Sequence, residues 1–200
     1  MHREETTPDS SRRIAAPTDD PDDPARYWST PDFEVMVEER LRRLLAYWRS
    51  KCLDGRWPTR QAIDPLDLGW ALDRIYLADR VPPPAVWRYR LAGARIEEIF
   101  KGRSMRGALL TELMAPDKAC LVIQRWQPLI DGGCAVYMHG LIYRANDRFP
   151  VGGRLLLPLG DGESDEVVGL IGITDIEWRT PASGSPAPEL DIHYMPLRGC

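Results

Sequence analysis

The chain has 200 residues, of which 44% are hydrophobic and 28% are charged, and its formal net charge is −4. This composition is typical of one soluble globular domain, and no apolar run approaches the length of about 18 residues that a membrane span needs. The acidic excess lies within residues 1–32, so acids and bases balance in the rest of the chain. Nucleic-acid-binding proteins usually carry a basic excess, and we therefore expect no nucleic-acid partner.

Both ends of the chain are expected to be tails. Residues 1–31 are acidic and rich in proline with few large apolar side chains, so burial cannot offset the entropy lost on folding, and we expect disorder. Residues 180–200 are similarly rich in proline and serine. The N-terminal segment also lacks the apolar core of a signal peptide, which favours a cytoplasmic protein. These boundaries leave a single domain over residues 32–179.

The first expected element is a helix over residues 32–53. Thr30 is a candidate N-cap, and Pro31 fits the first helical position. An apolar stripe recurs three or four residues apart and consists of Phe33, Val37, Leu41, Leu44, Leu45 and Trp48. The stripe can pack against the rest of the domain or against the same helix in a second copy. The second alternative predicts a homodimer through this helix.

The middle of the chain is expected to form a hairpin followed by helices. Bulky and charged side chains alternate at residues 74–80 and 87–91, which predicts two strands joined by a proline-rich turn. A helix begins at Gly93, because its apolar side chains recur three or four apart. Further helical material is expected over residues 109–130, with a fresh start at Pro116.

Three apolar runs separated by turn-rich loops complete the domain, at residues 134–144, 154–160 and 167–178. They are expected to be antiparallel strands. The order is then a helix, two strands, a helical crossover and three strands. This order predicts an α+β fold with a five-stranded antiparallel sheet and its helices on one face.

Several segments, in this order and spacing, resemble bacterial PAS-like sensor domains that carry an added N-terminal helix. They are YWRS, IDPLDLGWALDRIYLADR, YRLAGARIEEIF with GRSMRG after it, RLLLPLG and VVGLIGITDI, and they cover about residues 40–177. The resemblance implies helices that close over one face of a curved sheet, around a small cavity or a filling of side chains. It also implies a stand-alone sensory or regulatory module without catalysis, acting through a protein partner or by dimerisation.

Aromatic and methionine side chains in the expected strands and helices are candidates for lining such a cavity, because small-molecule sites are mostly apolar with a few polar groups. We predict that the ligand-binding residues are Tyr89, Phe100, Met105, Trp126, Tyr137 and His139. The same side chains could instead form a solid core, and the sequence leaves both interpretations open. It identifies neither the ligand nor a cofactor.

Two other functions remain as alternatives. His139 is the only histidine within residues 32–179, and as a general base it would suit a small α+β enzyme with a cone-shaped cavity. A pure protein-interaction scaffold could instead use the first helix and the arginine-rich rim of residues 88–106. Four cysteines without CxxC or zinc-ligand spacing predict no metal site, and we expect free thiols.

Overall fold

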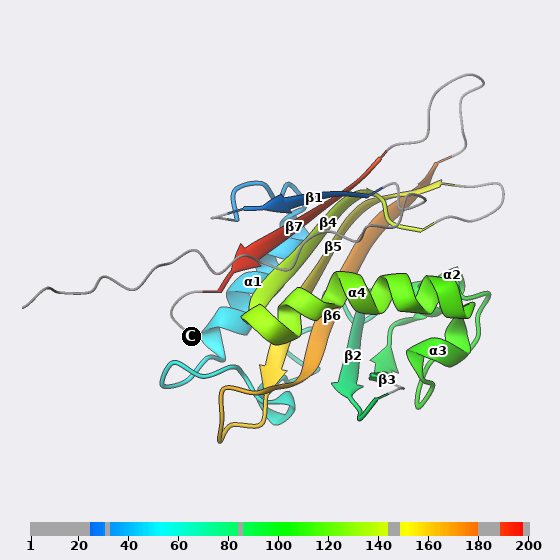
Figure 1. Ribbon diagram of the computed structural model, residues 1–200. Helices are drawn as coiled ribbons and strands as arrows, with labels where there is room; N and C mark the ends of the chain where they lie inside the picture. The colour runs from blue at the N-terminus through cyan, green and yellow to red at the C-terminus, as the bar shows by residue number, and fades with distance from the viewer. Residues whose placement is uncertain (1–24, 31–32, 84–85, 144–148, 180–188, 198–200) are drawn as a thin grey trace, which may run out of the picture.

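The computed structural model describes residues 25–30, 33–83, 86–143, 149–179 and 189–197. These residues form one mixed sheet with helices on both of its faces (Figure 1). The helical elements are α1 (Glu39–Ser50), a 3-10 turn at Arg60–Ala62, α2 (Ala94–Ile99), α3 (Leu110–Leu113) and α4 (Pro116–Gly132). The strands are β1 (Ala25–Ser29), β2 (Ile75–Arg80), β3 (Trp87–Ala92), β4 (Cys134–Leu141), β5 (Phe149–Gly160), β6 (Val167–Arg179) and β7 (Leu190–Pro196).

The sheet has the spatial order β1-β7-β4-β5-β6-β2-β3, so the expectation of five antiparallel strands is wrong. Each expected strand is present, and the pairs among β2 to β6 are antiparallel. The two additional strands lie beyond β4, where β7 pairs antiparallel with β4 and β1 pairs parallel with β7. The parallel pair makes the sheet mixed.

The additional strands come from segments expected to be tails, so the boundaries at 32 and 179 are wrong. In β7, Leu190, Ile192 and Tyr194 alternate with polar residues and point into the core, as in a half-buried strand. The proline- and serine-rich composition around this segment conceals that alternation. Thr30, expected to cap a helix, instead extends β1, because its backbone N–H donates to the Tyr194 carbonyl at 3.1 Å. The rest of both expected tails lies outside the described residues.

Helix α1 covers the opposite face of the sheet from α4, so the expectation that all helices share one face is wrong. Figure 1 shows α4 in front of the sheet and α1 behind it. The burial pattern agrees: Leu44 of α1 belongs to one apolar cluster with Leu155 and Ile171, while Trp126 of α4 belongs to another with Leu156. Alternation along β5 sends consecutive leucines to the two faces.

The apolar stripe of α1 packs against the sheet of its own chain. Leu41, Leu44, Leu45 and Trp48 are buried, and the Trp48 indole N–H donates to the Pro158 carbonyl at 2.8 Å. The helix is shorter than the expected span of 32–53. A homodimer through this helix would therefore use its exposed face, and it stays a prediction.

The bounds of helix α4 agree with the sequence prediction, whereas the prediction for the cysteines is only partly right. Helix α4 begins at Pro116 and ends at Gly132, and it is capped by Gly133, whose φ of 54° lies in the left-handed region that glycine adopts readily. Cys120 and Cys134 are free thiols as expected, whereas Cys52 is disulfide-bonded, so that expectation is wrong for Cys52. Spacing along the chain carries no information on which thiols meet in space.

No helix in the described part of the chain is long and apolar enough to cross a membrane.

Candidate ligand-binding site

Four aromatic side chains cluster on the sheet face that α4 covers. Tyr76 of β2 and both Trp87 and Tyr89 of β3 point to this face, and Trp126 of α4 packs among them. The Trp126 ring centroid lies 5.7 Å from that of Trp87 and 6.4 Å from that of Tyr76. Tyr89 lies 5.9 Å from Tyr76. All four are buried, and the tilted and edge-on pairs contribute about 0.5–1.5 kcal/mol each beyond burial.

A glycine on the neighbouring strand sets the position of Tyr76. Gly172 of β6 lies opposite Tyr76 in the β2–β6 register. A Cβ atom at position 172 would lie 2.3 Å from Cζ and 2.6 Å from the hydroxyl oxygen of Tyr76. The Tyr76 phenol therefore packs directly against the backbone of β6, which is possible only beside a residue without a side chain.

Two polar atoms of this cluster are buried without a hydrogen-bond partner among the described residues. They are the indole Nε1 atoms of Trp87 and Trp126. An indole N–H can only donate, so each tryptophan lacks an acceptor. Leaving such a group unsatisfied costs about 1–3 kcal/mol. The cluster therefore presents hydrogen-bond donors that the described part of the protein does not use.

Arg154 of β5 adds a buried positive charge on the same face. Only 6% of the residue is exposed, and its cross-strand neighbours are Met138 of β4 and Thr174 of β6. Its Nε donates to the Thr174 hydroxyl at 3.1 Å, and its guanidinium carbon lies 4.4 Å from the Tyr143 ring centroid. The Tyr76 centroid lies 5.8 Å away. Among the described residues, its polar partner is the Thr174 hydroxyl, and no Asp or Glu forms an ion pair with it.

This charge is not neutralised by its aromatic neighbours. Burial raises the pKa of Tyr76, although Arg154 and Thr174 act in the opposite direction. Burial also raises the pKa of Tyr89 far above its usual range, and Tyr76 raises it further. Both phenols are therefore neutral, whereas an arginine stays charged in proteins. We call Tyr76, Trp87, Tyr89, Trp126 and Arg154 the cup.

The order of strands and the comparison with known families decide the identity of the fold. Helices α2 to α4 connect β3 to β4, and five strands follow the spatial order β3-β2-β6-β5-β4. A family model described as PAS domain matches residues 36–174, well over half of the chain. The chain belongs to the PAS domain family. No curated protein and no solved structure matches it significantly.

Membership in the PAS family confirms the resemblance found in the sequence and makes the chain a sensory or regulatory module in general terms. The structure places four of the predicted ligand-binding residues on the cup side of this PAS domain. Tyr89, Met105 and Trp126 are buried there, and Phe100 is half-buried at the end of α2, edge-on to Tyr143. Ligand binding by these residues stays a prediction.

The other two predicted residues lie on the α1 face of the PAS sheet. Tyr137 and His139 alternate along β4 with Met138, which points to the cup side. Glu38, the residue before α1, joins them: its carboxylate accepts from the Tyr137 hydroxyl at 2.9 Å and lies 2.8 Å from His139 Nδ1. Burial raises the pKa of Tyr137, and Glu38 raises it further. The structure therefore does not bring the six predicted residues together.

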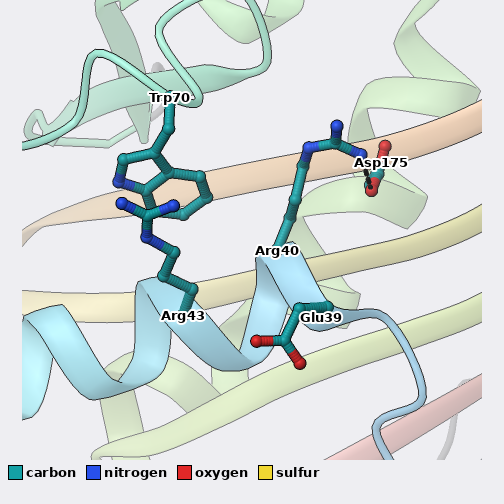
Figure 2. A pocket seen from close by; sticks show the side chains of 5 residues that line it. All are labelled: Glu39, Arg40, Arg43, Trp70 and Asp175. Carbon is teal, nitrogen blue, oxygen red and sulfur yellow. Dashed lines mark hydrogen bonds and ion pairs between the residues drawn. The ribbon is translucent and has the colours of Figure 1, made fainter.

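A groove lies beside α1, between this helix, Trp70 and Asp175 of β6. It encloses about 430 Å³ and is lined by Glu39, Arg40, Arg43, Trp70 and Asp175 (Figure 2). Arg40 donates to the Asp175 carboxylate at 3.1 Å, and the Arg43 guanidinium carbon lies 4.3 Å from the Trp70 ring centroid. Arg40 of this groove is therefore paired with an acidic side chain, whereas Arg154 has no acidic partner among the described residues.

The arginine-rich rim of residues 88–106 is also partly neutralised. Arg90 forms an ion pair with Asp79, and Arg95 forms one with Asp73 at 2.7 Å. These exposed pairs contribute little to stability, at roughly 0–1 kcal/mol each. They leave the rim with less positive charge than its sequence indicates.

Sequence reasoning missed Arg154, Tyr76 and Thr174. The signal for Arg154 was available in the run RLLLPLG, because alternation places residue 154 on the same face as Leu156. A charged residue at a core-facing position of a strand is uncommon unless it is paired or functional. The absence of a partner for it could not be read from the sequence.

Proposed function

We propose that this PAS domain is a sensory module that binds a small molecule among the cup residues. The observation that carries the proposal is the buried Arg154, which has no acidic partner among the described residues, beside the unsatisfied indole donors of Trp87 and Trp126. More than nine in ten buried polar groups in proteins have a hydrogen-bond partner. A cluster of exceptions is expected where a ligand supplies the missing acceptors.

Mass spectrometry under native conditions and thermal unfolding test this proposal together. The protein purified from its expression host is examined for a bound small molecule, and a panel of metabolites is then screened for thermal stabilisation. A ligand at a hundred times its Kd adds about 2.7 kcal/mol, which raises the Tm by about 5–11 °C for a domain of this size.

A matched pair of variants localises the ligand. Trp126→Phe removes a buried indole N–H, whereas Trp28→Phe makes the same change at an exposed position of β1. We expect the ligand-induced shift to fall in Trp126→Phe and to persist in Trp28→Phe. A protein that carries no small molecule and whose Tm responds to none in the panel is not a sensor of this kind, and a protein-interaction scaffold then remains.

We further propose that the domain acts in the cytoplasm and transmits its signal through a homodimer or a protein partner on the exposed face of α1. Ala46 lies on that face, and Gln124 is an equally exposed position on α4. Light scattering after gel filtration should show that Ala46→Arg weakens self-association and that Gln124→Arg does not. A monomeric wild-type protein, with and without ligand, contradicts the dimer and favours the protein partner.

We propose no catalytic role for His139. Its side chain is on the α1 face of the sheet, 43% exposed, and outside the cup. Its contact with Glu38 instead ties the start of α1 to β4. Replacement of His139 by Gln should therefore leave ligand binding in the cup unchanged, measured by the same thermal shift.

A further inference from the structure

The geometry of Arg154 indicates which part of its guanidinium faces a ligand. One of its three nitrogens, Nε, is occupied by the Thr174 hydroxyl, and one flat face is covered by the Tyr143 ring. Among the described residues, the bond to Thr174 is the one hydrogen bond that this guanidinium makes, which leaves the edge formed by its two terminal NH2 groups for a ligand. This edge is the part of an arginine that forms two parallel hydrogen bonds with a planar carboxylate.

The charge of the cup sets the charge of its ligand. Arg154 is the only buried charged residue in the described part of the chain, since the other buried polar residue is Thr174. The neighbouring tyrosines are neutral. One negative charge balances one positive charge, whereas a dianion such as a fully ionised phosphate ester would bring an uncompensated charge into a buried site.

Tyr76 connects the charged end of the cup to the donor end. The Tyr76 ring centroid lies 5.8 Å from the guanidinium carbon of Arg154 and 6.4 Å from the ring centroid of Trp126. Trp126 in turn touches Trp87, so both unsatisfied indole groups belong to the same end. The surfaces between these polar groups are aromatic rings, which favour an apolar or aromatic body.

We propose that the ligand is a monocarboxylate whose carboxylate pairs with the terminal edge of Arg154 and whose opposite end carries an acceptor for an indole N–H of Trp126 or Trp87. This inference rests on the proposed function, because it names the chemical class that the cup binds.

The experiment compares acids with their own amides, which have nearly the same shape but no charge. Three pairs serve as probes: acetate and acetamide, 4-hydroxybenzoate and 4-hydroxybenzamide, and 4-methoxybenzoate and 4-methoxybenzamide. The last two acids carry an acceptor oxygen opposite the carboxylate, as the proposal requires. Any small molecule retained from expression is first removed by unfolding and refolding, and Kd values are then measured by calorimetry at pH 7.5. We expect at least one acid to bind at least tenfold more tightly than its amide.

Variants at position 154 assign that preference to the arginine. Arg154→Met keeps a long side chain without charge, and Arg154→Lys keeps the charge without the planar edge. We expect the preference to vanish in Arg154→Met and to fall severalfold in Arg154→Lys. Arg154→Met should also unfold at a higher Tm than the wild type in the absence of ligand, because an unpaired buried charge is removed. Should Arg154→Met fail to fold, Arg154→Lys and the wild-type acid and amide pairs still decide the question.

The outcomes separate this inference from the proposed function. Amides that bind as tightly as acids, or an uncharged molecule retained from expression, overturn the carboxylate inference and leave the sensory function intact. A lower Tm for ligand-free Arg154→Met shows that the arginine is satisfied within the fold and also overturns the inference. If no acid binds and no small molecule is retained, both the inference and the small-molecule function are overturned.

Discussion

Replacing Gly172 with alanine tests whether Tyr76 packs against the backbone of β6. The added Cβ would lie 2.3 Å from Cζ of Tyr76, where carbon atoms normally stay about 3.5 Å or more apart. The ring cannot move freely, because it packs beside Trp126 and Tyr89. Overpacking of this kind typically costs about 1–3 kcal/mol. We expect a loss of about 2 kcal/mol, which corresponds to a fall in Tm of about 4–8 °C for a domain of this size.

The assay is thermal unfolding followed by circular dichroism, with urea unfolding at 25 °C as a second measure. Gly132→Ala is the matched control, because an added Cβ there meets no atom within 4 Å and the residue lies in α4, where alanine is favoured by up to about 1 kcal/mol. In a Tyr76→Leu background, Gly172→Ala should cost much less, since the ring is gone. Equal effects of Gly172→Ala and Gly132→Ala would refute this placement of Tyr76.

Three further changes probe other parts of the fold. Trp48→Ala should lower the free energy of unfolding, measured in urea, by about 3–5 kcal/mol, because it removes the buried side chain that fills the space between α1 and the sheet. A loss below about 1 kcal/mol would contradict that packing. Burial lowers the pKa of His193 below its usual value of about 6.5, while Asp191 opposes the effect and His139 adds to it, so the unfolded chain binds this proton more readily. Stability should therefore fall as the pH drops below about 6.5, and the Tm of His193→Asn should fall less than that of the wild type between pH 7.5 and 5.5; equal falls contradict this. Burial raises the pKa of Cys134 to about 12, so in Cys120→Ser this thiol should react with a maleimide only after unfolding, whereas rapid labelling of the native protein would place it near solvent.

The site itself was only partly accessible from the sequence. Aromatic residues in strands and helices predict a cluster, and Tyr89, Met105 and Trp126 indeed lie together in the core. Tyr137 and His139 were grouped with them because the sequence gives the type of a residue more readily than the face of the sheet it occupies. One residue of difference in strand phase moves a side chain to the other face.

The sequence by itself determined the local elements and the family. Pro116 begins α4, a glycine ends it, and alternation marks β2 and β3, because caps, turns and strand periodicity act between residues close along the chain. Only the tertiary structure decided that residues 25–29 pair with residues 190–194, that α1 covers the face opposite α4, and that Arg154 is buried without an acidic partner among the residues that the structure describes. These features depend on contacts between distant segments. Their free energy comes from burial and pairing in the complete fold, which no short stretch of sequence encodes.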